Sequence, residues 1–377
     1  MLQHHCGHSP QAGVGKAKCA LGCVHASRFR TIGPAADWAA RALVYAIAHR
    51  PLPQLRNFTH PVATYPMRSL IVRLPNHLGD ACMSLPTLDR LAAQGIELTL
   101  AARPWATELL DAYPWPVVAM GARALDRIAA LRAARTRKPQ ERDALLLTNS
   151  FSSALDFRLA GLQAAGYATD ARRWLLHRAY AVPSAWSNGM HMVEYYFCLA
   201  GKLLGLAPAA APAPQLLLSA ASRERARDAL VRAGAGSNYI ALCPIAHGRH
   251  RGRIKSWQGF GRMAQELRSG GHEVIVCPGP GEEAAAHAAA SSARMLGPLD
   301  LGAFGALLAH SRLVIANDSG PGHLAAAVGA RLVGVFGVTE PAKTRPLGPR
   351  VQLVGGADGW PSYEEVAAAV ATQLEER

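Results

Sequence analysis

Short apolar runs alternate with longer amphipathic stretches along the chain from position 67 onward. Runs rich in β-branched residues predict strands, and apolar positions spaced three or four apart predict helices. In the first half the predicted strands are residues 69–74, 96–101, 117–119 and 144–147, and the predicted helices are residues 81–93, 151–161 and 191–204. Strands that alternate with helices are typical of parallel sheets, so this pattern predicts an α/β domain.

A Pro- and Ala-rich segment at residues 206–214 interrupts the alternation and is typical of a semi-rigid linker. Beyond it the pattern predicts strands at residues 239–243, 273–277, 313–316 and 332–336, and helices at residues 221–233, 256–268, 282–290, 301–310, 323–328 and from Ser362. We therefore predict two Rossmann-like domains with parallel sheets, facing across a cleft. The N-terminal domain covers residues 67–206, the linker covers residues 207–216 and the C-terminal domain covers residues 217–377.

Residues 1–66 differ from the rest, since they hold seven basic residues against one acid and show little sustained periodicity. They are consistent with a basic arm, with a small accessory segment, or with an extension before a true start at Met67. We favour the extension, poorly ordered or non-native, because Met67 directly precedes the first predicted strand. Cys6, Cys19 and Cys23 lie in this segment, but their spacing is poor for a zinc site.

Composition narrows the function classes. Half of the 377 residues are hydrophobic, and no apolar run reaches the roughly 18 residues that predict a membrane span. Seven cysteines without framework spacing indicate a reducing compartment. The net charge of +14 favours anionic partners: nucleic acid, membrane or phosphorylated substrates. Because aromatic residues are few and not interleaved with the basic ones, nucleic acid is the least favoured of these.

The loop 317–323, Asn-Asp-Ser-Gly-Pro-Gly-His, is the clearest candidate for chemistry. It leads from a predicted strand into a predicted helix, so it lies at the carboxyl edge of a parallel sheet, where ligands bind. Gly320 and Gly322 allow close approach of the backbone, and free N–H groups at a helix start bind anions such as a diphosphate. A Gly/Pro turn in which Asp318 caps a helix explains the same residues, and the loop alone does not decide between the two interpretations.

Two further loops lie at such edges. Asp80 follows the first predicted strand, where it suits either a helix start or a general base for an acceptor hydroxyl. Lys255 follows the very basic loop 248–254, whose own role the sequence leaves open, and it suits a point charge on a diphosphate. No Asp-x-Asp pair occurs in the chain, so a metal held by two carboxylates is not indicated.

Several motifs, in order, resemble those of the ADP-heptose:lipopolysaccharide heptosyltransferases, glycosyltransferase family 9. They cover the chain from Met67 almost to its end, and the first two look most like the heptosyltransferase II branch. The matching stretches are residues 74–86 (LPNHLGDACMSLP), 149–154 (NSFSSA), 242–244 (LCP), 255–257 (KSW), 317–323 (NDSGPGH) and 336–339 (FGVT). The resemblance implies a GT-B fold and an inverting transfer of heptose from ADP-heptose to the lipopolysaccharide inner core, without a cofactor or a metal.

The resemblance also assigns site residues. It implies that Asp80 is the general base and that Lys255 acts on the donor phosphates. Further donor contacts would come from Asp318, Ser319, Gly320, Gly322, His323, Thr339, Leu299 and Glu282. The acceptor, lipid A carrying Kdo or heptose, would meet residues of the N-terminal domain: Asn76, Asn149, Ser150, Arg103 and Arg173, with Arg158 and Arg172 as further candidates.

The chain also departs from the family pattern. His77 stands where the family often has Trp, and Ser256-Trp257-Gln258 follows Lys255 in place of Arg-Trp-Pro. Another surface glycan or a protein therefore remains open as the acceptor, and a non-catalytic sugar-nucleotide-binding module remains open as an alternative function. The resemblance implies a cytoplasmic protein, with peripheral contact to the inner membrane as an option.

Overall fold

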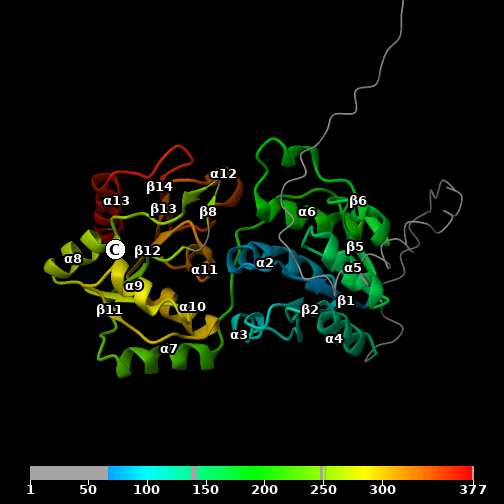
Figure 1. Ribbon diagram of the computed structural model, residues 1–377, viewed down its shortest axis with the longest axis horizontal. Coiled ribbons are helices and arrows are strands. Elements are labelled where there is room, and N and C mark those ends of the chain that lie inside the picture. The colour runs from blue at the N-terminus through cyan, green and yellow to red at the C-terminus, as the bar shows by residue number, and fades with distance from the viewer. Residues whose placement is uncertain (1–66, 137–141, 247–248, 251, 376–377) are drawn as a thin grey trace, which may run out of the picture. The chain divides into compact units, whose positions relative to one another are not determined.

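The computed structural model describes residues 67–136, 142–246, 249–250 and 252–375. The predictions made for residues 1–66, including a zinc site, therefore lie outside the described residues, as does part of the basic loop 248–254. The domain boundaries given above also stay predictions. Within the described residues, two parallel sheets surrounded by helices confirm the α/β class that the alternating pattern predicts (Figure 1).

The first sheet has six parallel strands in the order β3-β2-β1-β4-β5-β6. Ile71 of the central strand β1 pairs with Thr99 of β2 on one side and with Ala144 of β4 on the other. The strands are β1 Ser69–Arg73, β2 Glu97–Ala102, β3 Val117–Ala119, β4 Asp143–Leu146, β5 Gln163–Tyr167 and β6 Arg178–Tyr180. The helices are α2 Leu78–Ala92, α3 Ala106–Leu109, α4 Ala124–Thr136, α5 Phe151–Leu159 and α6 Met192–Leu204, with 3-10 turns η1 Arg172–Leu175 and η2 Ser184–Trp186.

The second sheet repeats this strand order as β11-β10-β7-β12-β13-β14. Its strands are β7 Tyr239–Cys243, β10 Glu273–Val276, β11 Arg294–Met295, β12 Leu313–Asn317, β13 Leu332–Phe336 and β14 Val351–Gly355. Its helices are α7 Ala220–Arg232, α8 Phe260–Ser269, α9 Glu283–Ala289, α10 Leu301–His310, α11 Gly320–Ala327, α12 Pro341–Thr344 and α13 Tyr363–Glu375. A short antiparallel hairpin, β8 Arg249–His250 and β9 Arg253–Ile254, follows β7.

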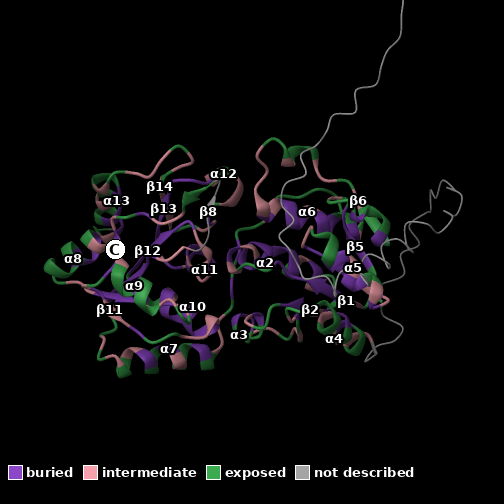
Figure 2. Ribbon diagram, viewed as in Figure 1, coloured by how far each residue is buried: buried purple, intermediate pink, exposed green. Residues whose placement is uncertain are grey.

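Each sheet contains a switch point, a place beside a central strand where the strand order reverses. The position of the switch point indicates where a ligand can bind. The order reverses between β1 and β4 in the first sheet and between β7 and β12 in the second. In open α/β sheets the crevice at the carboxyl ends of such strands is the usual ligand site. Every residue of β7, β12 and β13 is buried, as expected for parallel strands covered on both faces (Figure 2).

Three predicted helices begin several residues away from the start that the pattern suggests, and α2 is one of them, beginning at Leu78 and not at residue 81. α8 begins at Phe260, not at Ser256, because the backbone N–H of Trp257 donates to Oδ1 of Asn317 at 2.9 Å and holds residues 255–257 out of the helix. α11 begins at Gly320, not at His323, because Pro321 fits the first helical turn, where its missing N–H costs nothing.

Several elements of the structure are absent from the apolar pattern, among them α4, β5, β6 and β14. The helix α4 has only three large apolar residues, β5 contains three small residues, and β6 and β14 are sheet-edge strands without a fully buried residue. Edge strands need no continuous apolar run, so hydrophobic periodicity gives them little signal. No helix or strand forms between α6 and α7, where Leu216 N–H donates to the Ala327 carbonyl at 2.9 Å.

Candidate functional site

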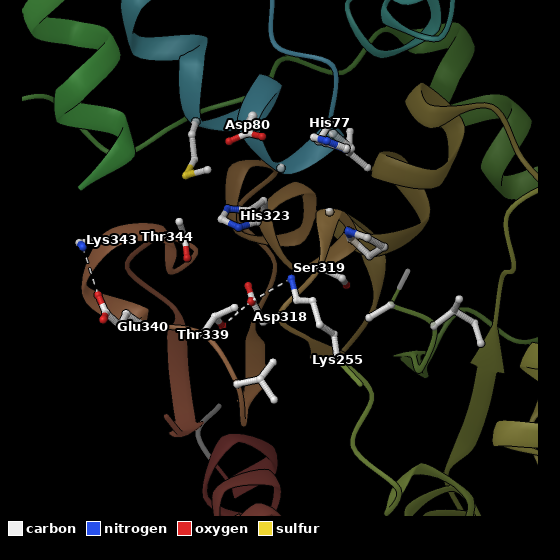
Figure 3. A pocket seen from close by; sticks show the side chains of 18 of the residues that line it. His77, Asp80, Lys255, Asp318, Ser319, His323, Thr339, Glu340, Lys343 and Thr344 are labelled. Carbon is white, nitrogen blue, oxygen red and sulfur yellow. Dashed lines mark hydrogen bonds and ion pairs between the residues drawn. The ribbon is translucent and has the colours of Figure 1, made fainter. Parts of the chain in front are cut away.

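A cavity of about 740 Å³ is lined by the polar loops at the carboxyl ends of β1, β7, β12 and β13 (Figure 3). This volume is in the range of small-molecule sites. The cavity brings together eight of the residues that the sequence singles out: Asp80, Glu282, Lys255, Asp318, Ser319, Gly320, His323 and Thr339. The proposed base and most of the proposed donor contacts therefore line the same space.

Asp80 lies in the first turn of α2, which begins at Leu78 after the extended residue His77. Burial raises the pKa of the Asp80 carboxyl, because desolvation disfavours the charged form. Three neighbours act in the opposite direction on that pKa: the charge of His77, a hydrogen bond from the Tyr196 hydroxyl and the charge of Lys255. The result is a carboxylate at the cavity wall that can accept a proton.

Asp318 is the centre of a polar cluster at the end of β12. Its Oδ2 atom lies 3.3 Å from Nζ of Lys255 and accepts a hydrogen bond of 2.5 Å from Oγ1 of Thr339. The Asp318 side chain is only 7% exposed, so its charge is held by these two partners and not by bulk water. Figure 3 shows Lys255 reaching across the cavity floor toward this carboxylate.

Asn317 explains why Lys255 lies so close to Asp318. Its Oδ1 atom accepts from the backbone N–H of Trp257, and its Nδ2 group donates to the Pro244 carbonyl at 2.6 Å. One buried amide thus joins the loop after β7, the segment after the basic hairpin and the end of β12. The sequence gives little indication of this supporting role, because it shows Asn317 only as the first residue of the motif 317–323.

His323 is buried in the first half of α11, between the Asp80 and Asp318 carboxylates (Figure 3). The pKa of His323 is lowered to about 4, mainly by burial; the charge of Asp318 acts to raise this pKa, and the charges of His191 and Lys255 act to lower it. The imidazole is therefore neutral at pH 7. His323 also packs against Gly79, where an added Cβ would lie 2.8 Å from its Cδ2 atom.

Of the two glycines of the α11 loop, Gly320 is the one that close packing requires. A Cβ on Gly320 would lie 2.9 Å from Cβ of Leu78, so Gly320 permits the start of α11 to contact α2. Gly322 is buried and does not line the cavity. Ser319, the residue before α11, stays partly exposed at the cavity wall, beside the free N–H groups of the helix start.

Several cavity residues were not assigned a role from the sequence. Arg253 of the basic loop lies at the rim and donates to the carbonyls of Gly337 at 2.7 Å and Ala357 at 3.0 Å. Lys343, which also lines the cavity, forms an ion pair of 3.3 Å with Glu340. The density of basic residues in 248–254 is the signal that points to Arg253, and His77 was noted only as a departure from the family pattern, whereas nothing in the pattern singles out Lys343 or Thr344.

The residues predicted to bind the acceptor lie outside this cavity, at the ends of strands in the first sheet. Asn76 accepts from Arg73 at 2.6 Å, and Ser150 caps α5 by accepting from Ser153 N–H at 3.3 Å. Arg103 and Arg173 are exposed after β2 and β5. Leu299, predicted as a donor contact, packs against the core and does not line the cavity.

Asn149 and Arg172 are already engaged inside the protein. Asn149 accepts from Arg172 at 3.2 Å and donates to the Tyr195 hydroxyl at 2.9 Å. Arg172 is fully buried and also donates to the backbone carbonyls of Tyr167 and Thr148. Its guanidinium therefore ties the ends of β4 and β5 together, which makes it a structural residue and not a surface contact for acceptor phosphates.

The described residues give no sign of a metal site or a membrane span. No three His, Cys, Asp or Glu side chains in this part of the chain are grouped so that they could hold a metal ion. Among its helices, none combines the length and the apolar character that crossing a membrane requires.

Similar proteins identify the family. The family model for glycosyltransferase family 9 (heptosyltransferase) matches residues 134–372, more than half of the chain. Lipopolysaccharide heptosyltransferase 3 of Escherichia coli is 33% identical over 136 residues, which is 33% of this chain and 39% of that relative. Lipopolysaccharide heptosyltransferase 2 of Salmonella typhimurium is 27% identical over 313 residues, which is 76% of this chain and 88% of the relative.

The fold agrees with a solved structure. The structure of E. coli ADP-heptose lipopolysaccharide heptosyltransferase II superposes with a TM-score of 0.68 at 23% identity, covering 81% of this chain and 98% of that one. The two parallel sheets therefore form the GT-B fold, as the resemblance implies. With its family match and this fold, the chain belongs to glycosyltransferase family 9 (heptosyltransferase).

Proposed function

We propose that the protein is an inverting glycosyltransferase that moves heptose from ADP-heptose to the lipopolysaccharide inner core. Family membership and the names of the similar proteins support this reaction class. The observation that carries the proposal is the shared cavity. A partly buried carboxylate from the first turn of α2, Asp80, lines the same space as the cationic Lys255 and the α11 loop that follows β12.

In the proposed step, an acceptor hydroxyl oxygen attacks the anomeric carbon of the donor heptose. The new C–O bond forms while the bond from that carbon to the β-phosphate oxygen breaks, and ADP leaves with the electron pair. The hydroxyl proton passes to the Asp80 carboxylate, whose raised pKa favours accepting it. The negative charge that develops on the leaving diphosphate is stabilised by Lys255 and by the N–H groups at the start of α11.

The cluster around Asp318 fits a donor site that exists before the donor binds. Lys255 pairs with Asp318, and this ion pair holds the ammonium group at the cavity, where a diphosphate could meet it. Thr339 keeps the Asp318 carboxylate in one orientation, from which it can orient the loop or a sugar hydroxyl. Glu282 at the same cavity wall is the candidate contact for the ribose.

The acceptor is proposed to be lipid A carrying Kdo or heptose, with the exposed residues Asn76, Ser150, Arg103 and Arg173 as its contacts. Guanidinium groups fit the phosphates and carboxylates of such an acceptor. Because this acceptor carries a lipid, the proposed place of reaction is the cytoplasmic face of the inner membrane. The reaction is proposed to proceed without a metal, so excess EDTA is expected to leave the transfer rate unchanged.

Asp80→Asn tests the base. The variant is expected to bind ADP-heptose with the affinity of the unsubstituted protein but to lose about 100-fold or more of its transfer rate, because an amide cannot accept the proton. Calorimetric titration of the donor and an ADP-release assay with defined truncated cores measure the two quantities. Asp89→Asn, an exposed carboxylate on the same helix, is the control. Transfer at the normal rate by Asp80→Asn would contradict the assignment.

The acceptor needs its own test, because the departures at His77 and after Lys255 leave other acceptors open. A strain without the protein is expected to make a core that lacks heptose, seen by mass spectrometry of lipid A–core. An unaltered core would instead favour another surface glycan or a protein acceptor. Absence of ADP release with every acceptor would favour a non-catalytic sugar-nucleotide-binding module.

A further inference from the structure

The charged side chains that line the cavity are not evenly paired. Four are the carboxylates Asp80, Glu282, Asp318 and Glu340, and three are the cations Arg253, Lys255 and Lys343. Nζ of Lys255 lies 3.3 Å from Oδ2 of Asp318. Nζ of Lys343 lies 3.3 Å from Oε2 of Glu340, and both ion pairs are drawn in Figure 3. Among the residues that the structure describes, Arg253 forms no ion pair, so no carboxylate there offsets its charge.

Main-chain carbonyls nevertheless hold Arg253 in place. Arg253 lies in β9, where it pairs with His250 of β8 after a turn that ends at Gly252. Its Nη2 group donates to the Gly337 carbonyl at 2.7 Å, and its Nη1 group donates to the Ala357 carbonyl at 3.0 Å. Carbonyl oxygens orient a guanidinium but carry no net charge, and these two bonds use only part of its N–H groups. Arg253 therefore brings an oriented positive charge with spare donors to the cavity.

The neighbours of Arg253 belong to the proposed donor site. Lys255 follows two positions later, and an extended chain places alternate side chains on one face, so both cations line the same cavity. Gly337, whose carbonyl accepts from Arg253, directly follows β13 and begins the loop of Thr339. Thr339 in turn donates to Asp318. The guanidinium therefore lies beside the loop that completes the Asp318 cluster.

We propose that Arg253 is a second phosphate contact of the donor site, besides Lys255, and that it binds the diphosphate of the nucleotide sugar. This inference rests on the proposed function, because it needs a donor that carries a diphosphate. Both phosphates of such a donor are negatively charged, and a planar guanidinium can bind two oxygens of one phosphate at once. Asp318 offsets the charge of Lys255, so Arg253 is expected to supply a large share of the attraction for the diphosphate.

The same contact favours the transfer step. When the bond between the anomeric carbon and the β-phosphate oxygen breaks, the electron pair stays on that oxygen and the negative charge of the diphosphate grows. A cation that is already oriented stabilises this charge without the cost of rearranging during the reaction. Arg253 is therefore expected to assist the departure of ADP as well as to bind the donor.

Binding of ADP and of adenosine to the variant Arg253→Gln tests the contact. Gln keeps an amide that can donate to a main-chain carbonyl, but it has no charge. The Kd for ADP, measured by isothermal titration, is expected to rise about tenfold, at the low end for a charged hydrogen bond because Arg253 is exposed. The Kd for adenosine, which has no phosphate, is expected to stay the same in ligand-observed NMR titrations. Arg253→Lys keeps the charge without the planar fork, so its Kd for ADP is expected to be intermediate.

Arg268→Gln is the matched control, because it removes one positive charge from an exposed residue of α8 that does not line the cavity. Its Kd for ADP is expected to equal that of the unsubstituted protein. An unchanged Kd for ADP in Arg253→Gln would overturn the inference. Equal losses of affinity for ADP and adenosine would overturn it too, because they indicate that Arg253 only supports the loop at Gly337. Thermal unfolding verifies that all variants compared are folded.

These titrations need neither an acceptor nor turnover, which keeps the inference separate from the proposed reaction. A selective loss of ADP affinity in Arg253→Gln supports the contact even if no acceptor is ever found. ADP binding that does not depend on Arg253 overturns the inference and leaves the proposed transferase intact. Absence of ADP binding by the unsubstituted protein would contradict the donor assignment and the inference together.

Discussion

A Cβ atom added to Gly79 would lie 2.8 Å from Cδ2 of His323. Gly79 lies in the first turn of α2 and His323 in the first half of α11, so the two helices that begin at the cavity are in contact there. A second close approach, between Gly320 and Leu78, lies beside the first. The distance between the proposed base and the proposed donor loop is therefore set by two residues without side chains.

Gly79→Ala is expected to push these helix starts apart. An extra methyl group in a packed contact costs about 1–3 kcal/mol of stability, and a shift of the reacting groups by about 1 Å can cost about 100-fold in rate. Denaturant unfolding and the ADP-release assay measure the two effects. Gly95→Ala would be a poor control because of its positive φ, whereas Gly236→Ala, in open space, is a suitable one. Normal transfer by Gly79→Ala would show that the contact does not set the site geometry.

Lys255→Met is expected to weaken donor turnover and to leave Asp318 without its cation. Removing one group that stabilises a developing oxyanion typically lowers kcat by about 100-fold or more. The buried Asp318 carboxylate would then repel the negatively charged diphosphate, so the Kd for ADP is expected to rise as well. Isothermal titration with ADP checks this, with Lys255→Arg as the variant that keeps the charge. Equal ADP affinity in Lys255→Met and the parent would contradict the assignment.

Adjacent arginines on η1 are expected to behave differently. Arg172→Met removes a fully buried guanidinium and leaves the backbone carbonyl of Thr148 without its donor, at about 1–3 kcal/mol. Arg173→Met, at the exposed neighbour, is expected to leave stability unchanged and to raise the acceptor KM. Unfolding midpoints and acceptor saturation curves separate the two. The reverse pattern would mean that Arg172, and not Arg173, meets the acceptor.

The buried imidazole of His323 predicts a loss of stability in acid. Its native pKa is about 4, below the value of about 6.5 in an unfolded chain. The unfolded state therefore takes up the proton first, and the contribution of His323 is complete above about pH 6.5 and is lost as the pH falls toward 4. The raised pKa of Asp80 acts in the opposite direction, so the parent must be compared with His323→Asn. As the pH falls from about 6.5 to about 4, the free energy of unfolding is expected to fall less in His323→Asn than in the parent.

The sequence alone determined the α/β class, the strand-to-helix loops that carry Asp80, Lys255 and Asp318, and the family. Hydrophobic runs mark central strands because those strands are buried on both faces, and loops after such strands meet at one edge of a sheet. The sequence did not predict the edge strands β6 and β14, nor the exact starts of α8 and α11. Edge strands lack the continuous apolar run, and the starts of both helices depend on local features, the Trp257–Asn317 bond and the fit of Pro321.

Tertiary structure decided which of the polar residues act together. Nothing in the spacing of Asn317 and Trp257 shows that one amide joins their loops, and nothing in an Arg-Arg pair shows that Arg172 is buried while Arg173 is exposed. Periodicity reports which face of an element is buried, whereas the hydrogen bond between Trp257 and Asn317, 60 positions apart, depends on where the chain places both partners in space.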